Sequence, residues 1–336
     1  MSRTVLEVAD LRVELTTPRG IVHAVDGASF ELSAGDALGL VGESGCGKTM
    51  TLRAIMRLLP AGGRVVGGNV FLEGVDLLGL DAVAMQHVRG RSIAMIFQEP
   101  MTALNPVMRV GDQIAEGPQA HLGQTRRQAY ATAIDLMRLV GIPDAKRRAS
   151  SYPHEFSGGM RQRVMIAIAL ACRPKLILCD EPTTALDVTI QDQVLKLLVG
   201  VCREFGAALV FVTHDLAVIA QTCQSVAVMY AGQVIEAGSV DAVFREPRHP
   251  YTLGLLRSVP DVEKVSDSLE PIDGSPPDLM APPLGCRFHP RCPFVENDCR
   301  SGDFPLRLVE VGRTTACIHQ ERALESVREH PVIAGA

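Results

Sequence analysis

Tryptophan is absent from this chain, aromatic residues are scarce, and charge of neither sign dominates. Aromatic residues make up 4% of the 336 residues, and 33 Lys and Arg residues stand against 38 Asp and Glu residues, which gives a formal net charge of −5. Proteins that bind nucleic acid usually carry a basic surface, and this composition does not supply one. We therefore expect neither DNA nor RNA as a partner.

Long hydrophobic runs are also missing. The most apolar stretch, residues 164–172, is far shorter than the ~20 residues that cross a bilayer, and Glu7 and Asp10 interrupt the N-terminal stretch where a signal peptide would be apolar. We therefore expect a soluble protein that stays in the cytosol. Because cytosolic cysteines remain reduced, the nine cysteines are predicted to be thiols or metal ligands rather than disulfides.

These cysteines are unevenly distributed. Five lie scattered among apolar or small residues: Cys46, Cys172, Cys179, Cys202 and Cys223. Four are gathered in the last quarter of the chain: Cys286, Cys292, Cys299 and Cys317. Four thiolates suffice for a tetrahedral metal ion or a [4Fe–4S] cluster, although the spacing is that of neither a standard zinc finger nor a ferredoxin. Only the second group predicts a site.

A glycine-rich loop follows a predicted buried strand over residues 37–41 and precedes a predicted helix over residues 48–59. The loop comprises Gly42, Glu43, Ser44, Gly45, Cys46, Gly47, Lys48 and Thr49. In a strand-loop-helix unit the free backbone N–H groups of the helix N-terminus point at phosphates. We expect Lys48 to neutralise the β- and γ-phosphates and the Thr49 hydroxyl to bind Mg²⁺. The loop therefore predicts a nucleotide site.

Three further apolar strands each end on polar residues. The strands are predicted over residues 93–97, 176–179 and 208–213. Gln98 follows the first, Asp180 and Glu181 follow the second, and His214 follows the third. Because ligands bind at the carboxyl ends of parallel strands, we expect these side chains to converge on the nucleotide.

Each strand-end residue has an expected role. Asp180 would hold Mg²⁺ through a water molecule, and Glu181 would orient or deprotonate the attacking water. His214 would sense the γ-phosphate, and Gln98 would join both the metal and the catalytic site. These roles predict hydrolysis of ATP.

A third motif, Ser157-Gly158-Gly159-x-x-Gln, stands at the start of a predicted helix, about twenty residues before the Asp-Glu pair. Its small, donor-rich helix start suits contact with an anion but offers no base or metal ligand. The combination of phosphate loop, this signature, the Asp-Glu pair and His214 resembles the ATP-binding cassette (ABC) ATPases. The resemblance implies an α/β fold, a P-loop NTPase of ABC type with a mainly parallel sheet core.

In that family the signature of one subunit contacts the γ-phosphate bound to another, so that two cassettes close head to tail. This chain has one set of motifs, so a second cassette must come from another chain. Ala185, Leu186 and Asp187 match the loop that crosses this interface in ABC proteins. These cassettes usually stack adenine on an upstream aromatic residue, but none precedes Phe30 here, so base stacking is expected either to be weak or to come from Arg19 or His23.

The domain organisation also follows from the pattern. We expect the ABC ATPase domain over residues 1–250, with a helical subdomain inserted over about 99–155, in which residues 125–140 form the clearest amphipathic helix. A hairpin is predicted from 225–230 and 233–237 around Ala231-Gly232. Residues 251–336 are predicted to form a separate, loop-rich extension, since seven prolines occur between 271 and 293.

Residues 249–256 and 285–293 resemble the C-terminal extension of the dipeptide and oligopeptide importer ATPases, and residues 99–106 are similar to the same group. The resemblance implies an ATPase subunit that powers import of short peptides, at the cytoplasmic face of the inner membrane. Its implied partners are a second, different cassette, two membrane-spanning permease subunits and an external peptide-binding protein. Residues 98–105 would receive a permease helix. Some members carry a [4Fe–4S] cluster on a matching four-cysteine tail, with Zn²⁺ or unliganded thiols as alternatives.

Two other functions remain alternatives. A relative in the same family imports nickel. Soluble ABC ATPases act on ribosomes or DNA, but they usually carry two cassettes in one chain or a long coiled-coil insertion, and neither feature occurs here.

Overall fold

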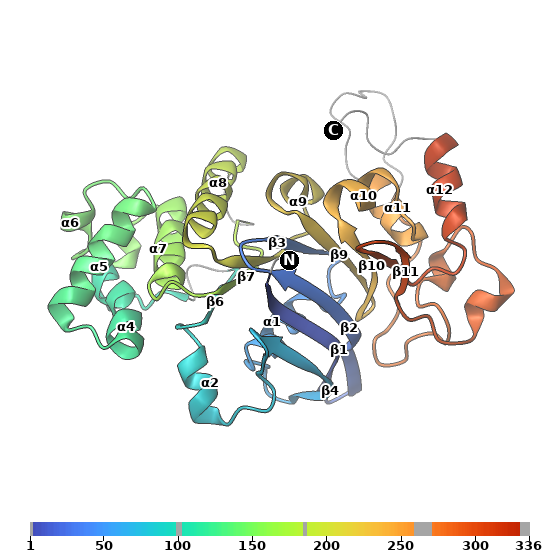
Figure 1. Cartoon of the computed structure of the whole chain (residues 1–336), viewed down its shortest axis with the longest axis horizontal. Helices are drawn as coiled ribbons and strands as arrows, with labels where there is room; N and C mark the ends of the chain where they lie inside the picture. Colours follow the sequence, from blue (N-terminus) through green and yellow to red (C-terminus); the bar gives the residue numbers. More distant parts are fainter. Residues whose placement is uncertain (1–2, 99–102, 184–186, 259–270, 330–336) are drawn as a thin grey trace. The chain divides into compact units, whose positions relative to one another are not determined.

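The computed structural model describes residues 3–98, 103–183, 187–258 and 271–329 (Figure 1). The chain divides into two compact units. The first comprises residues 1–6, 32–37 and 72–212, and the second comprises residues 7–31, 38–71 and 213–336.

The first unit contains three parallel strands in the order β8-β7-β6. Their bounds are β6 (Ile93–Ile96), β7 (Leu176–Asp180) and β8 (Ala208–Val212). Leu176 pairs with Ile93 on one side and with Ala208 on the other. Every residue of β7 and β8 is buried, as expected for central parallel strands. The three strands confirm the sequence prediction, and β7 runs one residue further than predicted, so that Asp180 belongs to it.

Helices make up the rest of the first unit, together with the short strand β5 (Val75–Asp76). They are α2 (Ala82–Val88), α4 (Val110–Leu122), α5 (Arg126–Leu139), α6 (Ala145–Arg148), the 3-10 turn η1 (Pro153–Glu155), α7 (Gly158–Leu170) and α8 (Val188–Phe205). Thr125 caps α5 through a reciprocal capping box with Gln128, which explains why the amphipathic pattern begins there. Helix α7 packs against both α4 and α5.

The second unit contains five strands in the order β11-β12-β10-β9-β3. Their bounds are β3 (Ala37–Val41), β9 (Ser225–Tyr230), β10 (Gln233–Ser239), β11 (Arg307–Glu310) and β12 (Arg313–Thr315). Strands β3 and β9 are parallel, and β9 and β10 form the predicted antiparallel hairpin. Strand β12 pairs with β10, with Glu236 opposite Thr315. The residues after 250 therefore extend this sheet instead of forming a detached appendage, while the boundary near 250 stays a prediction.

A second sheet in this unit contains long N-terminal strands that the sequence analysis did not predict. They are β1 (Thr4–Thr17), β2 (Gly20–Ser33) and β4 (Gly63–Leu72), in the order β2-β1-β4. Asp10 interrupts the alternation of β1 with a φ of 49°. The irregularity hides the period of two that marks a half-buried strand.

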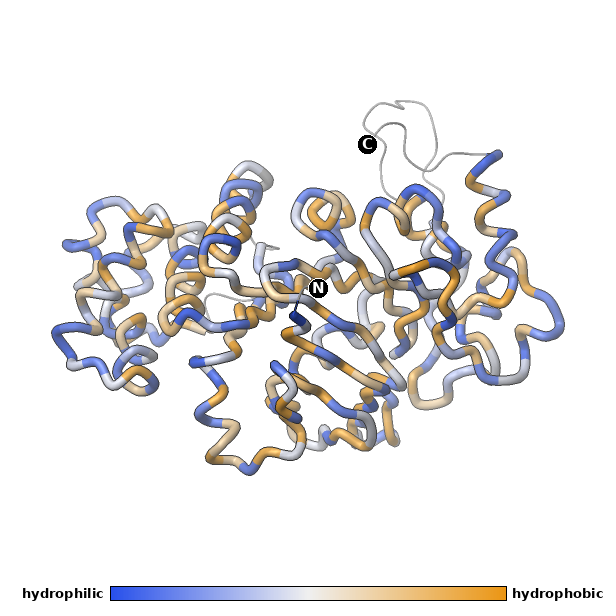
Figure 2. Tube along the Cα trace, viewed as in Figure 1, coloured by the Kyte–Doolittle hydropathy of each residue, from blue (hydrophilic) through white to orange (hydrophobic). Residues whose placement is uncertain are grey.

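The helices of the second unit are α1 (Lys48–Ile55), α9 (Leu216–Thr222), α10 (Val240–Arg245), α11 (Pro250–Arg257) and α12 (Gln320–Glu329), with 3-10 turns η2 (His289–Arg291) and η3 (Asn297–Arg300). Helix α1 ends four residues before the predicted Leu59, because Arg57 takes a φ of 51°, which breaks the helical path. Helix α12 carries bands of polar and apolar residues (Figure 2), and its Ala323 and Val327 pack against Leu253. Among the described helices, none is long and apolar enough to cross a membrane.

Candidate functional site

The phosphate loop lies between β3 and α1 in the second unit. The Lys48 ammonium is buried and donates hydrogen bonds to the carbonyl oxygens of Gly42 and Glu43, at 2.7 and 2.9 Å. Gly47, with a φ of 108°, stands directly before α1, and any side chain there would overlap the Ala24 carbonyl oxygen. The loop thus has the backbone freedom and the helix N-terminus that phosphate binding requires.

Two residues from the C-terminal part of the chain hold this loop from outside. The Tyr251 hydroxyl accepts a hydrogen bond from the Glu43 backbone N–H at 2.8 Å. The Arg291 guanidinium donates two hydrogen bonds to the Glu43 carboxylate, of 2.7 and 3.0 Å. Sequence analysis did not connect either residue with the nucleotide site, because they lie more than 200 positions from the loop and their segments resemble only the C-terminal extension.

In the first unit, the predicted strand-end residues of β6 and β7 come together. Asp180 is the last residue of β7 and is buried, whereas Gln98 is exposed just beyond β6. The Gln98 side-chain amide donates a hydrogen bond to the Glu181 carboxylate at 3.1 Å. Glu181 has a φ of 45°, which is rare for a residue with a side chain, and its N–H donates to the Val212 carbonyl at 3.0 Å. Backbone strain of this kind is concentrated at functional residues.

His214 lies just beyond β8, exposed, and belongs to the second unit. The next residue, Asp215, caps α9 by accepting hydrogen bonds from the Ala217 and Val218 N–H groups. The convergence of His214 and the phosphate loop with Gln98, Asp180 and Glu181 stays a prediction.

The signature motif opens α7. Ser157 is its N-cap and accepts a hydrogen bond from the Met160 N–H at 3.4 Å. Ser157 and Gly158 are exposed. A side chain at Gly159 would lie 2.8 Å from the Ile190 side chain of α8, so close packing demands glycine there. The motif therefore presents an exposed helix N-terminus, as the sequence predicts.

Some predicted residues fall outside the described part of the chain. These are Ala185 and Leu186 of the interface loop and residues 99–102 of the peptide-importer motif. Asp187, which completes the interface loop, is the N-cap of α8. Asn105, the next-to-last residue of the peptide-importer motif, is held by the buried Gln113, whose amide donates to the Asn105 carbonyl at 2.9 Å.

The two candidates for adenine stacking lie near the start of the second unit. Arg19 is exposed in the turn between β1 and β2. His23 lies next to Ala24, whose carbonyl oxygen faces Gly47 of the phosphate loop. The His23 ring is 3.6 Å from the Glu14 carboxylate. His23 is therefore placed beside the loop, and stacking on adenine stays a prediction for either residue.

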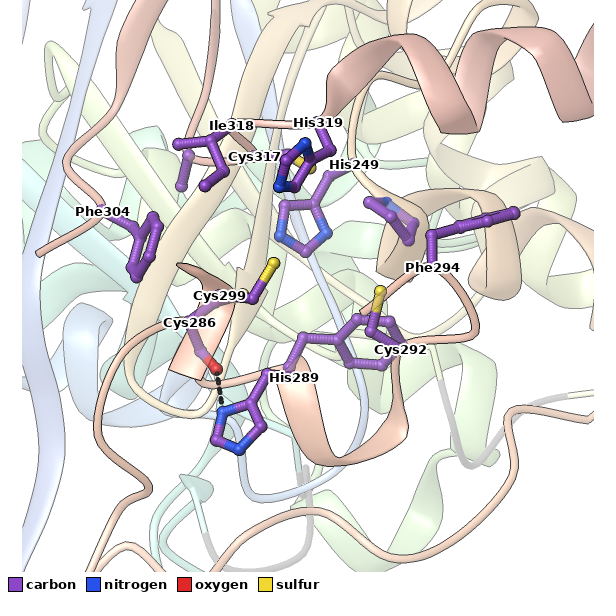
Figure 3. A pocket seen from close by; sticks show the side chains of 13 residues that line it. His249, Cys286, His289, Cys292, Phe294, Cys299, Phe304, Cys317, Ile318 and His319 are labelled. Carbon is purple, nitrogen blue, oxygen red and sulfur yellow. Dashed lines mark hydrogen bonds between the residues drawn. The ribbon is translucent and has the colours of Figure 1, made fainter. Parts of the chain in front are cut away.

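The four C-terminal cysteines line one cavity in the second unit (Figure 3). Burial raises the pKa of the Cys286 thiol, of Cys292 to about 11 and of Cys317 to about 12. At neutral pH these thiols are therefore protonated unless a cation binds between them. The structure brings together the four residues that the sequence grouped.

A buried histidine lines the same cavity. The Nδ1 atom of His249 accepts a hydrogen bond from the Tyr251 N–H at 3.1 Å, and burial lowers its pKa to about 3. The neutral ring must therefore carry its proton on Nε2. This Nε2 atom is buried and has no hydrogen-bond partner among the described residues. The cavity thus contains four sulfur atoms and an orphaned N–H donor.

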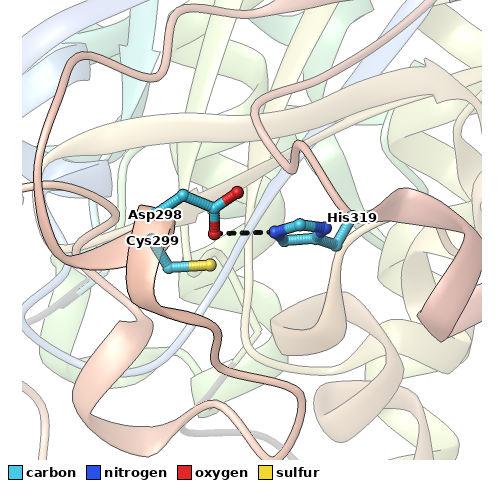
Figure 4. A group of neighbouring side chains, drawn as sticks. All are labelled: Asp298, Cys299 and His319. Carbon is cyan, nitrogen blue, oxygen red and sulfur yellow. Dashed lines mark hydrogen bonds and ion pairs between the residues drawn. The ribbon is translucent and has the colours of Figure 1, made fainter.

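At the edge of this cavity, the His319 ring bonds to the Asp298 carboxylate at 2.9 Å, and Cys299 lies beside them (Figure 4). The hydrogen bond from His319 lowers the pKa of Asp298. Within the described residues, this is the single group of three or more Cys, His, Asp and Glu whose ligand atoms all lie within 4.8 Å of one another. No three of the four cysteine sulfur atoms therefore lie within 4.8 Å of one another.

Known protein families match both the nucleotide-binding part of the chain and its C-terminal part. The family profile described as "ABC transporter" matches residues 25–184, and the profile described as "Oligopeptide/dipeptide transporter, C-terminal region" matches residues 235–299. The chain is 48% identical to the oligopeptide transport ATP-binding protein OppD of Salmonella typhimurium, over 94% of each chain. It is 49% identical to a probable peptide ABC transporter ATP-binding protein of Sinorhizobium fredii, over 93% of this chain and 94% of that one.

Solved structures show the same fold. The ATP-binding cassette MJ0796, in a dimeric state bound to ADP and Pi, superposes with a TM-score of 0.63 at 24% identity, and covers 70% of this chain and 98% of its own. The cbiO1 protein of Clostridium perfringens superposes with a TM-score of 0.62 at 24% identity, over 72% of this chain and 91% of its own.

Proposed function

Because this chain belongs to the family of ATP-binding proteins of oligopeptide ABC transporters, we propose that it hydrolyses ATP to power the import of di- and oligopeptides. The extent of the likeness carries the proposal. Nearly half of the residues are identical over 94% of the chain, and the matched part includes the C-terminal region of peptide transporters as well as the cassette.

In the proposed ATP site, the phosphate loop binds the nucleotide, and Lys48 leaves the Gly42 and Glu43 carbonyls to meet the β- and γ-phosphates. The Thr49 hydroxyl, the Asp180 carboxylate and the Gln98 amide oxygen are hard oxygen donors, the type that Mg²⁺ prefers. When bound, Mg²⁺ neutralises phosphate charge.

Glu181 is the proposed general base for the attacking water. The Gln98 amide donates a hydrogen bond to the Glu181 carboxylate and so fixes its orientation. Gln98 therefore acts partly through Glu181. His214 is the proposed γ-phosphate sensor. The backbone of Ser157, Gly158 and Gly159 is proposed to contact the γ-phosphate held by a second cassette.

The proposed assembly contains a second, homologous but different cassette, two permease subunits and an external peptide-binding protein, at the cytoplasmic face of the inner membrane. The exposed signature helix supports contact with a second cassette. Asn105, anchored by the buried Gln113, supports a fixed docking point for a permease helix after Gln98. We further propose that the cassette ends near residue 250, with the helical subdomain over about 99–155.

For the cysteine cavity we propose a [4Fe–4S] cluster held by Cys286, Cys292, Cys299 and Cys317. A tetrahedral zinc ion with Zn–S bonds near 2.3 Å would draw its sulfur ligands to about 3.8 Å from one another. No three of these sulfur atoms lie within 4.8 Å of one another, a spacing that suits a larger group. The Nε2–H group of His249, which has no partner among the described residues, could donate a hydrogen bond to a sulfur atom of the cluster. Such a cluster would cross-link the loops of the extension and could carry one electron.

Growth on peptides tests the proposed function. A strain of the natural host that lacks this chain and requires an amino acid should fail to grow when that amino acid is supplied only within tri- or tetrapeptides. Wild-type protein should restore growth, whereas Lys48→Ala, which removes the phosphate-binding ammonium, should not. Growth of the deleted strain on peptides, or a defect confined to nickel accumulation, would contradict the proposal.

A further inference from the structure

The stretch between the first two cavity cysteines, residues 286–292, touches the phosphate loop and its flanks at three successive points. Arg287 bonds to the Asp26 carboxylate and to the Ala231 carbonyl. Phe288 packs edge-on against Tyr230, with ring centroids 5.2 Å apart. Arg291 pairs with Glu43 inside the loop itself. One short segment thus contacts both the cysteine cavity and the nucleotide loop.

The Arg291–Glu43 pair is unusually well fixed. The Arg291 side chain is only 4% exposed, and its other donors bond to the carbonyls of Asp273 and Ile272 at 2.9 and 3.2 Å. The guanidinium also lies over the Tyr230 ring, 5.8 Å from its centroid. Because a bidentate, buried arginine fixes both the position and the plane of its carboxylate, Glu43 has little freedom to move.

Tyr251 holds the same loop residue by its backbone. Its hydroxyl accepts the Glu43 N–H, and its ring packs against Phe288, with centroids 5.4 Å apart. Glu43 is therefore held by its side chain through Arg291 and by its main chain through Tyr251. Both contacts originate in the C-terminal extension, residues 251–336.

The next part of the loop is open around Gly45. A side chain at Gly45, whose φ is 79°, would meet no atom within 4 Å. Beyond it, the loop is fixed again where the Cys46 carbonyl accepts the Gly232 N–H at 2.9 Å. The part of the loop between Glu43 and Cys46 therefore depends on Glu43 for its shape. The N–H groups that must face the phosphates follow directly after Glu43.

From these contacts we propose that Arg291 and Tyr251 are positioning residues for ATP, which act through Glu43 to preorganise the phosphate loop. We further infer that the content of the cysteine cavity affects ATP affinity along this route, because Cys286 and Cys292 bound the segment that carries Arg291. The second part rests on the proposed metal-binding function of the cavity. The extension is then a component of the nucleotide site and not only an accessory segment.

The test measures equilibrium binding of a fluorescent ATP analogue to the purified full-length chain. Arg291→Ala should weaken binding about tenfold, and Arg291→Lys, which keeps the charge but loses the fork, should recover only part of it. Tyr251→Phe, which keeps the ring packing, should weaken binding about threefold. Arg322→Ala is the matched control, because Arg322 pairs with Glu296 in the same extension without touching the loop. Its affinity should equal that of the wild type.

Kinetics and thermal unfolding separate positioning from simple destabilisation. In the assembled transporter Arg291→Ala should raise the KM for ATP about tenfold and change kcat less than twofold, because Glu181 and Gln98 are untouched. Arg291→Ala and Glu43→Ala should be non-additive in affinity. Unchanged affinity in both Arg291→Ala and Tyr251→Phe, or loss of affinity only in proportion to a lowered melting temperature, would overturn the proposal.

A second cycle tests the route from the cavity. Cys286→Ser should weaken ATP binding in the wild-type background and add nothing in the Arg291→Ala background. Additive effects would overturn the route. Peptide-dependent growth of the wild type tests the proposed function, and the ATP-binding measurements test this inference. The two can therefore fail independently of each other.

Discussion

Gln98 donates a hydrogen bond of 3.1 Å to the carboxylate of Glu181, although 83 positions separate them in the sequence. Parallel pairing of β6 with β7, with Ile96 opposite Cys179, brings the two strand ends together. Glu181 also adopts a strained backbone conformation, with a φ of 45°. The carboxylate is therefore fixed both by its main chain and by an amide partner, as a preorganised catalytic base would be.

Replacing Glu181, the proposed base, gives the first prediction. Glu181→Gln should retain ATP binding and lower ATP turnover in the assembled transporter at least about a hundredfold, because a carboxamide cannot accept a proton from water. Binding and steady-state turnover, measured side by side, check this. Undiminished turnover would show that another group is the base.

Removing its partner should have a smaller effect on the same step. Gln98→Ala should lower kcat about tenfold with little change in KM, since the Glu181 carboxylate loses the amide that orients it. Gln119→Ala is a suitable control, because Gln119 donates its side-chain hydrogen bond within α4, to the Ala115 carbonyl. A larger effect on KM than on kcat would assign Gln98 to nucleotide binding instead.

The cysteine cavity predicts a defined metal content. Anaerobic purification of the chain with its co-expressed partners should yield about four irons and four sulfides per copy, with a visible absorption band, and Cys317→Ser should lose them. Cys202→Ala, which alters a buried thiol of α8, should retain them. Stoichiometric zinc would replace the cluster by a structural ion, and the absence of any metal would contradict both assignments.

His249 predicts a pH dependence of stability. Its pKa is about 6.5 when exposed and about 3 in the folded chain, so the unfolded chain binds the proton more tightly. Above about pH 6.5 the histidine is neutral in both states and the folded chain keeps its full stability. As the pH falls toward 3, protonation favours the unfolded chain, and the stability lost is about 2 kcal/mol at pH 5. In His249→Asn, which keeps an N-cap acceptor for Tyr251, denaturant unfolding should lose less stability between pH 7 and pH 5.

Glu236 is a second buried titratable group here, and its carboxylate accepts the His249 backbone N–H at 2.9 Å. Burial raises the pKa of Glu236, so it acts in the opposite direction, and it is present in both proteins. The difference between wild type and His249→Asn therefore isolates the histidine. Equal slopes with pH in the two proteins would contradict the buried, neutral state of His249.

The sequence predicted the parts of the fold that local patterns encode. Apolar runs before Gln98, Asp180 and His214 gave the parallel strands, and the amphipathic pattern of residues 125–140 gave α5. The N-terminal strand β1 was missed because Asp10 disrupts its alternation.

The site shows the same limit. Lys48, Asp180 and Glu181 belong to contiguous motifs, whereas Tyr251 of α11 and Arg291 of the proline-rich segment reach the loop only through folding of distant parts of the chain. No sequence period or spacing encodes such contacts. They depend on the pairing of Glu43 with side chains more than 200 residues away.

The most direct test of the account is uptake of a labelled tri- or tetrapeptide by proteoliposomes that contain this chain with its co-expressed partner subunits and the external binding protein. We predict uptake that requires internal ATP, stops in Glu181→Gln and is competed by unlabelled short peptides but not by nickel. ATP hydrolysis by the intact assembly without any accumulation of peptide would contradict the proposed function.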